Sequence, residues 1–563
     1  MKAAKRKQEK KPLQQTPQHQ ALWSPARMQW ILAALAVVLY LPSIKLGFTE
    51  LDDSIFIKEI SHYYQSWNNL ITSFRRGVFH ETQDIYYRPL LLNSFLINYK
   101  LSGEDIAGWR WVNIVLHALN VVLVYRLLLQ VNAGAKGAAI LAAVFAVHPV
   151  LVQAVVWIPG RNDSLLGVFV FSYLLLLTRF AQKPTVLNAA GQFLLLLGGF
   201  FTKESGVLTP LAGGVLWLLV LRRPIIHRTT WSVGAMGLVA ALIWFGLRSQ
   251  ATLASQQMHW AEMMQSFQYR LPVLFHYLGK VFFPVQLNVF PVQEDTSWVP
   301  FWITLGLITV LMYLTLKYGQ VLWHQLAGGL MIYVIFLIPA LLVPLSFNDQ
   351  DLEHRLYVPL IGILMALAAL QPRWVRHRLA AATVLVVLAV LITVNLSRHR
   401  YFNDPITFWE KAVADSPSEP YAKMMLASRL DKKDPHRADS LMRLAYRMDS
   451  SMKYINYYMG VLLQHRDSVL ESEPYFLREL QKSDYSHCYF HLAHVAFEKQ
   501  DRNQAMEWLQ EYLRRNPADG QGNHNLLLLY YEAGDTVKLK QQVKRMRQLG
   551  LPVPDVIAKA ADS

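Results

Sequence analysis

The sequence predicts an α-helical polytopic membrane protein that ends in a soluble, all-α repeat domain. Two observations support this fold class. Hydrophobic residues make up 53% of the 563 residues and the mean hydropathy is +0.20, which is too apolar for an ordinary soluble protein. The long apolar segments all precede Asn395, whereas the chain beyond it has the mixed polar and apolar pattern of paired helices.

The region 27–397 is predicted to be the membrane domain. A bilayer span needs roughly 20 apolar residues, and this region contains about eleven such segments. They lie near 28–46, 108–129, 138–157, 164–179, 185–202, 205–221, 230–247, 298–316, 325–346, 356–371 and 379–396. The stretch 269–293 is interrupted by Lys280 and three prolines, so it predicts a re-entrant or interfacial helix rather than a span.

Loop charges predict the orientation of these spans. The net charge is +16, and basic residues gather in the loops near 130–137, 179–183, 222–228, 317–324 and 373–378. The positive-inside rule places these loops in the cytoplasm together with a basic, disordered tail at 1–26, which lacks the cleavage site of a signal peptide. Two long loops, about 47–107 and 248–297, and the domain 398–563 are then external.

Several classes of protein are disfavoured by composition. The basic residues follow the loop pattern of a membrane protein, so no nucleic-acid partner is expected. The single cysteine, Cys488, excludes an internal disulfide framework and a cysteine-rich zinc site. Glycine-rich phosphate loops are absent from the sequence, which argues against a soluble nucleotide-sugar donor.

The C-terminal domain is predicted to consist of tetratricopeptide repeats. Residues 486–520 fit a 34-residue frame, with Leu492-Ala493, Ala505 and Pro517 at the expected offsets. Units near 418–450 and 451–485 are more degenerate. Such repeats stack into a superhelix whose concave face usually binds peptide, so a protein or peptide partner is expected there.

An acidic pair, Asp52-Asp53, follows the first predicted span. Aspartate before Ile55-Phe56-Ile57 is a good helix N-cap, which is the simplest interpretation of the pair. A carboxylate pair at a membrane surface can also act as a general base, or hold a divalent metal such as Mg²⁺ or Mn²⁺ without requiring one. Both interpretations remain open from the residues alone.

Four ionisable clusters fall at span ends on the same predicted side as this pair. They are His148-Pro149, Gly160-Arg161-Asn162-Asp163, Thr202-Lys203-Glu204-Ser205-Gly206 and the segment from Asp349 to Arg355. Each alone is explained by a paired loop tip or by side chains that reach the headgroups. Together they suit a substrate half in the membrane: Arg161, Lys203, His354 and Arg355 supply cations for a lipid phosphate, and the acidic pair supplies a base.

Ordered motifs then resemble a known family, the transmembrane and tetratricopeptide-repeat O-mannosyltransferases. They are Asp52-Asp53, Tyr87-Arg88-Pro89-Leu90, Trp111-Val112-Asn113 to Leu116-His117, His148-Pro149-Val150, Trp157 to Asp163, Lys203-Glu204-Ser205-Gly206 and Arg355-Leu356-Tyr357-Val358-Pro359. Order and spacing agree across about 40–415, and a repeat tail follows.

The resemblance implies the GT-C fold, a polyprenyl-phosphate-linked sugar donor and a catalytic base in the first external loop. That base maps to Asp52 or Asp53, with a slight preference for Asp52. Arg161, Lys203, His354 and Arg355 are then expected to hold the donor phosphate. Supporting residues are expected at Arg88, His148, Asp163, Glu204 and Tyr357.

The chain departs from the family at some positions. Animal members commonly have Glu where this chain has Gln153, in the run that begins at His148. The compact tail and basic start favour a bacterial inner membrane, with the N-terminus cytoplasmic and the repeats periplasmic.

The sequence therefore predicts an inverting glycosyltransferase, with mannose as the family default and Ser/Thr of exported proteins as acceptor. The alternatives are a transferase or ligase for a lipid or polysaccharide acceptor, and a non-catalytic scaffold with peptide-binding repeats. A transporter fits less well, because the charges lie mostly at the ends of spans.

Overall fold

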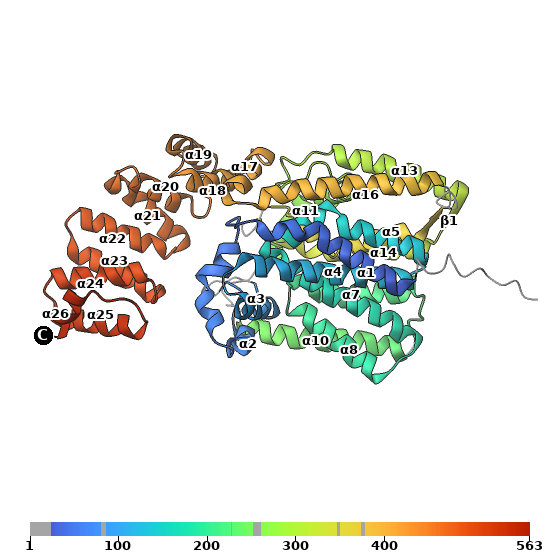
Figure 1. Ribbon diagram of the computed structural model, residues 1–563, viewed down its shortest axis with the longest axis horizontal. Coiled ribbons are helices and arrows are strands. Elements are labelled where there is room, and N and C mark those ends of the chain that lie inside the picture. The colour runs from blue at the N-terminus through green and yellow to red at the C-terminus, as the bar shows by residue number, and fades with distance from the viewer. Residues whose placement is uncertain are drawn as a thin grey trace, which may run out of the picture. The chain divides into compact units, whose positions relative to one another are not determined.

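The computed structural model describes residues 24–79, 86–226, 228–251, 260–345, 350–372 and 378–562. Most of the predicted basic tail lies outside these ranges, as do the loop residues 373–377 and Asp349 of the predicted polar cluster. The chain divides into two compact units, one that ends at Lys411 and one that begins at Ala412 (Figure 1).

The first unit is a helical bundle. Its helices are α1 (Pro25–Tyr40), α2 (Asn69–Thr72), α3 (Pro89–Ser102), α4 (Ile106–Gln130), α5 (Gly134–Val147), α6 (Val152–Val156), α7 (Arg161–Gln182), α8 (Val186–Phe200), α9 (Thr209–Val215), α10 (Arg228–Ala251), α11 (Trp260–Arg270), α12 (Val273–Phe282), α13 (Val299–Tyr318), α14 (Trp323–Leu342), α15 (Leu360–Ala369), α16 (Arg378–His399) and α17 (Pro405–Asp415), the last of which runs past Lys411. Two short strands, β1 (Gly319–Val321) and β2 (Leu370–Pro372), pair antiparallel.

Length and composition identify membrane spans among these helices. In the described residues seven segments qualify: Pro25–Lys45, Ile106–Gln130, Ile158–Gln182, Arg228–Ala251, Val299–Tyr318, Trp323–Leu342 and Ala380–Phe402. The bent pair Gly134–Val147 and Pro149–Val156 makes an eighth if it is one span. The protein is thus a helical, multi-pass membrane protein, as predicted, but the predicted count of about eleven is not reached by this criterion.

The shortfall in span number has a local cause. The segments predicted at 185–202 and 205–221 form shorter apolar helices, Val186–Phe200 and Glu204–Val220. The segment predicted at 356–371 contributes only the ten residues of α15. The interrupted stretch at 269–293 contains the ten-residue α12, which agrees with the prediction that it is not an ordinary span.

Small residues and helix caps shape the bundle. The Asp105 carboxylate accepts the Ala107 N–H and so begins α4, which packs against α1, α5 and α7. α14 and α15 approach so closely that a Cβ on Gly329 would lie 2.5 Å from the Gly362 carbonyl oxygen. Close backbone approach at small residues is the usual way in which membrane helices pack.

The segment between α1 and α4 is folded rather than open in its described residues, 41–79 and 86–105. It contains a π-helix (Ile55–Glu59), 3₁₀-helices (Ser61–Gln65 and Ser73–Arg75), α2 and α3. Buried Tyr64, Phe95 and Trp109 form part of its apolar cluster. α3 begins at Pro89, and this layer supports the polar groups described below.

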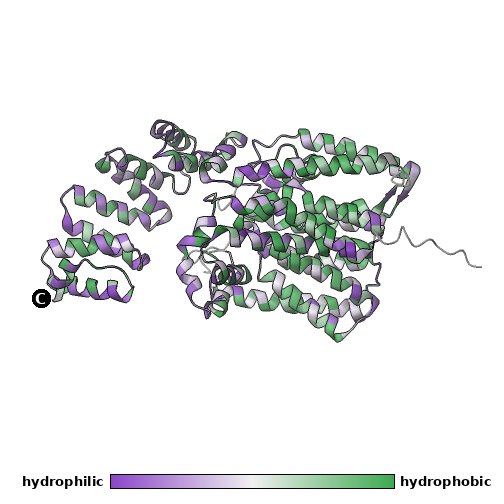
Figure 2. Ribbon diagram, in the orientation of Figure 1, coloured by the Kyte–Doolittle hydropathy of each residue, from purple (hydrophilic) through white to green (hydrophobic). Residues whose placement is uncertain are grey.

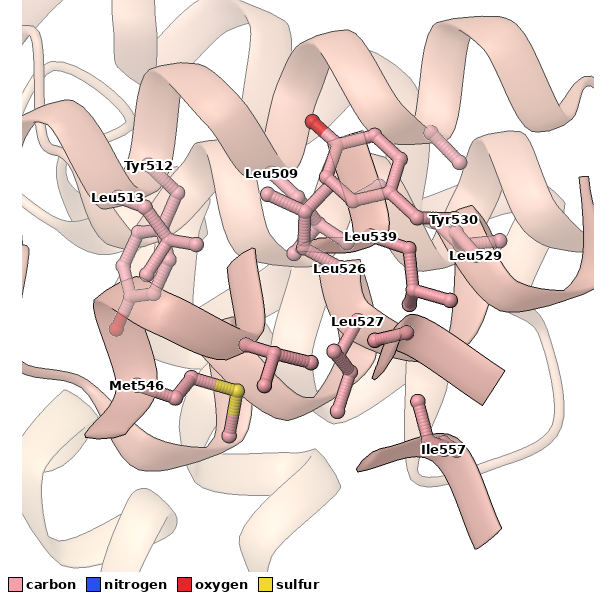
Figure 3. Close-up of a cluster of buried hydrophobic side chains, with 14 of the residues drawn as sticks. Leu509, Tyr512, Leu513, Leu526, Leu527, Leu529, Tyr530, Leu539, Met546 and Ile557 are labelled. Atoms are coloured by element: carbon pink, nitrogen blue, oxygen red, sulfur yellow. The ribbon is translucent and has the colours of Figure 1, made fainter. Parts of the chain in front are cut away.

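The second unit is built from helix pairs. Its helices are α18 (Pro420–Leu430), α19 (Pro435–Met448), α20 (Ile455–Gln464), α21 (Val469–Ser483), α22 (His487–Glu498), α23 (Arg502–Arg515), α24 (Gly520–Glu532), α25 (Thr536–Gln548) and α26 (Asp555–Asp562). Asp501 and Asp535, 34 residues apart, cap the second helix of successive pairs. Figure 3 shows the core of the last pairs, where Leu513, Leu527 and Met546 pack together.

Hydropathy separates the two units (Figure 2). Apolar residues cover whole helices of the first unit, whereas the helices of the second alternate polar and apolar faces. Exposed Trp231, Leu242 and Phe245 on α10 illustrate the first pattern. A helix that is apolar on its exposed side is stable when that side faces lipid.

Candidate functional site

The turn after α1 is built by the carboxylate of Asp53. Its two oxygens accept the N–H of Thr49 at 2.7 Å, the Thr49 hydroxyl at 2.9 Å, the N–H of Glu50 at 2.8 Å and the N–H of Ser54 at 3.0 Å. Asp53 is completely buried, and this burial raises its pKa although the Thr49 hydrogen bonds oppose the shift. Asp53 therefore acts as the cap that closes the turn.

Asp52 differs from its neighbour in both backbone and burial. Its φ is +66°, in the left-handed region that a non-glycine residue rarely adopts, and it is only half-buried. The indole N–H of Trp157 donates to the carbonyl oxygen of Leu51 at 2.7 Å, which fixes the peptide just before Asp52. The turn thus holds Asp52 in a strained but well-defined conformation.

Two ion pairs lie near this turn. The Arg88 guanidinium donates to both oxygens of Glu204, with an Nη2–Oε2 distance of 2.8 Å. The Lys203 ammonium donates to both oxygens of Asp163, at 2.7 and 2.8 Å. The four residues lie at the ends of helices: Arg88 precedes α3, Asp163 is in the first turn of α7, and Lys203-Glu204 follow α8.

Tyr86 connects these pairs to Asp52 and Arg355. Its ring lies 4.5 Å from the Arg88 guanidinium carbon. Burial raises the pKa of Tyr86, and the charges of Arg88, Glu204, Arg355 and Asp52 all act on it. Tyr86 was not among the predicted site residues. In the sequence it is marked only by its place two residues before Arg88.

His354 completes the group. It lies in the 3₁₀-helix Glu353–Leu356, and its Nε2 is 3.8 Å from a carboxylate oxygen of Asp163. Burial lowers the pKa of His354 well below its usual value, and Lys203, Arg355 and Arg88 lower it further. Both effects favour the neutral form of the ring.

We call these residues the Asp52 group: Asp52, Arg88, Asp163, Lys203, Glu204, His354 and Arg355. With His354 neutral, its three cations balance its three anions. Burial also lowers the pKa of Lys203, although Asp163 opposes the shift. Such a group offers a carboxylate, guanidinium and ammonium donors, and a neutral imidazole in one place.

Arg161 is not part of this group. Its side chain is fully buried and donates to the Asn113 side chain at 2.8 Å, to the Asn98 side chain at 2.6 Å and to the Trp109 carbonyl at 2.8 Å. Successive α-helical residues are 100° apart, so Arg161 and Asp163 point to different faces of α7. In this structure Arg161 ties α7 to α3 and α4, and the structure does not bring it to the Asp52 group; its predicted role as a donor phosphate ligand stays a prediction.

His148 and Tyr357 also lie elsewhere. The Nε2 of His148 bonds to the Val281 carbonyl at 2.8 Å, and its Nδ1 accepts the Val150 N–H at 3.2 Å. The Tyr357 hydroxyl contacts His117 Nδ1 at 2.8 Å and the Asn120 amide at 3.0 Å. Both side chains are buried and hydrogen-bonded outside the Asp52 group, and their supporting role stays a prediction.

A second set of charges, which we call the Glu353 cluster, consists of Lys280, Glu353 and Arg398. The Glu353 carboxylate accepts from Lys280 Nζ at 3.0 Å and from Arg398 Nη1 at 2.7 Å, and their side chains are 0–4% exposed. Successive 3₁₀ residues are about 120° apart, so Glu353 and His354 point in different directions. The sequence placed both in one cluster, but only His354 joins the Asp52 group.

A metal ion shared by Asp52 and Asp53 would need free lone pairs on the carboxylate oxygens of both residues. Both oxygens of Asp53 already accept two hydrogen bonds each, which leaves no lone pair directed at a cation. Among the described residues, no three His, Cys, Asp or Glu side chains are grouped as metal ligands. The residues present therefore do not fit the Mg²⁺ or Mn²⁺ site that the acidic pair permits without requiring.

Fold and site together define a multi-pass helical membrane protein with a polar group at the ends of its helices. Residues 89–245 match the family model of dolichyl-phosphate-mannose-protein mannosyltransferases. This range includes Asp163, Lys203 and Glu204, whereas Asp52, His354 and Arg355 lie outside it.

Curated relatives agree with this match. A protein O-mannosyl-transferase of Caenorhabditis elegans is 33% identical over 129 residues, covering 22% of this chain and 18% of that protein. The Mus musculus protein O-mannosyl-transferase TMTC1 is 34% identical over 143 residues, covering 23% and 15%. The Xenopus laevis protein O-mannosyl-transferase tmtc2 is 31% identical over 141 residues, covering 24% and 17%.

Each match thus spans less than a fifth of the relative's length. The matches confirm that this chain resembles the transmembrane and tetratricopeptide-repeat O-mannosyltransferases, a family of glycosyltransferase enzymes. The match to the family model lies within the first unit.

Proposed function

We propose that this protein is an inverting glycosyltransferase of the GT-C type. It moves a sugar, with mannose the family default, from a polyprenyl-phosphate donor to a Ser/Thr hydroxyl of an exported protein. The Asp52 group carries the proposal: the half-buried carboxylate of Asp52 acts on Tyr86 together with Arg88 and Arg355, near paired cations at the helix ends of a chain that resembles O-mannosyltransferases.

Asp52 is the proposed base. Its neighbour Asp53 has both carboxylate oxygens engaged by Thr49, Glu50 and Ser54, so it serves the turn. Asp52 removes the proton from the acceptor hydroxyl, whose oxygen then attacks the anomeric carbon on the face opposite the phosphate. General base catalysis of this kind contributes typically 10²–10⁴-fold.

The cations of the group stabilise the leaving phosphate. Charge grows on the phosphate oxygens as the glycosidic bond breaks, so donors placed there act mainly in the transition state. Lys203, His354 and Arg355 are the proposed phosphate ligands. The Arg88–Glu204 pair, 2.8 Å apart, supports them by fixing the start of α3 against the segment after α8.

The second unit is proposed to be a tetratricopeptide-repeat domain that presents the acceptor. Side chains 34 residues apart touch in successive helix pairs, as Asp431 and His465 do, and Tyr457 and His491 as well. The loop charges favour an external position for this unit and a cytoplasmic N-terminus. The proposed membrane is a bacterial inner membrane, in which this unit would be periplasmic.

The direct test uses purified full-length protein with polyprenyl-phosphate mannose and a Ser/Thr-rich peptide. Mass spectrometry should detect the peptide with one added hexose, and Asp52→Asn should reduce its rate at least 100-fold. Sugar transfer only to a lipid or polysaccharide would contradict the protein acceptor and retain the glycosyltransferase activity. If the protein neither transfers nor hydrolyses any lipid-linked sugar, it is a scaffold and the proposal fails.

A further inference from the structure

Gln153 has a fixed amide orientation. It is fully buried on α6, where its Nε2 donates to the Val289 carbonyl at 3.0 Å and its Oε1 accepts the backbone N–H of His354 at 3.1 Å. A carbonyl only accepts and a backbone N–H only donates, so one orientation alone satisfies both partners.

This orientation decides the tautomer of His354. The ring Nδ1 lies 3.3 Å from the same Oε1, and because an amide oxygen only accepts, the hydrogen-bond network assigns the proton to Nδ1. In the neutral ring Nε2 then carries a lone pair, 3.8 Å from an oxygen of Asp163. The Trp157 ring packs on His354 with centroids 5.4 Å apart and holds the imidazole plane.

Cations outnumber anions among the charged groups that act on the ring. Asp163 on α7, Lys203 after α8, Arg88 before α3 and Arg355 in the same 3₁₀-helix act on His354, whereas Gln153 and Trp157 on its α6 side are uncharged. A phosphodiester adds one negative charge to this group. Added negative charge near an imidazole favours its protonated form.

Resting on the function proposed above, we propose that Gln153 is a positioning residue for proton uptake. It holds His354 as the Nδ1–H tautomer, so that Nε2 takes a proton from a buffer acid or water when the donor phosphate binds. A new N–H bond forms at Nε2, the proton source is left as its conjugate base, and the imidazolium then donates to Asp163 or to the phosphate. When the phosphate departs, the proton returns to solvent.

Calorimetry of the full-length protein tests this step. The probe is a short-chain prenyl methyl phosphodiester, which has no group of its own that titrates near neutrality. Titrations at pH 7.5 in two buffers of different ionisation enthalpy give the protons taken up per probe bound. We expect close to one proton, and an affinity that falls tenfold per pH unit on the alkaline side.

Two variants separate this role from a merely structural one. Gln153→Glu places a carboxylate against Nδ1–H, which protonates the ring before binding, so proton uptake should fall toward zero and the pH profile should flatten. His354→Gln retains a hydrogen-bonding side chain that does not titrate, so it should bind the probe with no uptake at any pH. If Gln153→Glu does not fold, judged by its thermal unfolding, His354→Gln alone decides.

The possible outcomes are distinct. Binding without proton uptake by the unmodified protein, or equal uptake by either variant, overturns the inference and leaves the proposed function standing. Failure of the unmodified protein to bind the phosphodiester contradicts the proposed function, and this inference falls with it.

Discussion

The Asp52 group and the Glu353 cluster show how similar charged residues serve different ends. Both join side chains that are far apart in the sequence, and both contain Lys or Arg paired with a carboxylate at 2.7–3.0 Å. In the Glu353 cluster the side chains are 0–4% exposed, whereas Arg88 and Glu204 are 14% and 26% exposed. Arg88, Glu204 and Lys203 of the Asp52 group thus keep a part of their side chains exposed, whereas the Glu353 cluster is enclosed by protein.

The two sets also differ in their hydrogen-bond partners. Arg398 donates to the carbonyl oxygens of Pro149 and Asn288 as well as to Glu353, so the cluster fastens α16 to loops of the bundle. The Asp52 group is joined mainly side chain to side chain. Exposure and partner type, more than the presence of charge, separate a candidate site from a structural ion cluster.

The largest expected change in stability comes from Glu353→Gln. It leaves Lys280 and Arg398 buried without a counter-charge, and loss of one partner from a buried ion pair costs about 3–5 kcal/mol. Chemical unfolding in detergent measures the loss. The matched change Glu204→Gln, at a more exposed pair, should cost less than ~2 kcal/mol; equal losses would erase the distinction between the two groups.

The pH dependence of stability sharpens the same contrast. Burial opposes ionisation of Glu353, but Arg398 and Lys280 hold its pKa below its usual value. A lowered folded-state pKa adds stability that is present above the unfolded pKa, about 4.3, and is lost as pH falls below it. Unfolding free energy should therefore fall between pH 5 and 3 in the unmodified protein, and this slope should weaken in Glu353→Gln.

Lys203→Met should weaken donor binding more than folding. The ammonium bonds both oxygens of Asp163, and a hydrogen bond to a charged group is worth about 1.5–3 kcal/mol. We expect the donor KM to rise about 10–100-fold. Steady-state kinetics with varied donor measures this rise; an unchanged donor KM would remove Lys203 from the phosphate site.

Arg161→Lys tests whether Arg161 ties helices together or holds the donor phosphate. A lysine cannot reproduce the bonds to Asn98, Asn113 and Trp109, so stability should fall by about 1–3 kcal/mol. The donor KM of the folded fraction should change less than threefold. A selective rise in donor KM without a loss of stability would return Arg161 to the phosphate site.

Much of this organisation could be predicted from sequence. The length of the apolar segments predicted most of the spans, and the 34-residue period predicted the helix pairs of the second unit. Side-chain direction was harder, because the order of residues does not show which face each occupies. Helical geometry already separates Arg161 from Asp163, but Glu353, His354 and Arg355 required the 3₁₀ conformation to be known.

The acidic pair shows the same limit. Asp52 and Asp53 are equivalent in sequence, and either suits a cap or a base. A left-handed φ at Asp52 and four donors to Asp53 divide the two roles. Tyr86, by contrast, had no signal of its own, since its contact with the group depends on how α3 meets the segment after α8.

The central claim is that Asp52 acts on the acceptor while other members of its group hold the donor. Donor binding and turnover of Asp52→Asn, measured on the same preparation with polyprenyl-phosphate mannose and an acceptor peptide, test it most directly. We predict a donor Kd within about threefold of the unmodified protein and a kcat lowered 10²–10⁴-fold. A retained kcat, or a kcat and donor affinity lost together, would contradict the claim.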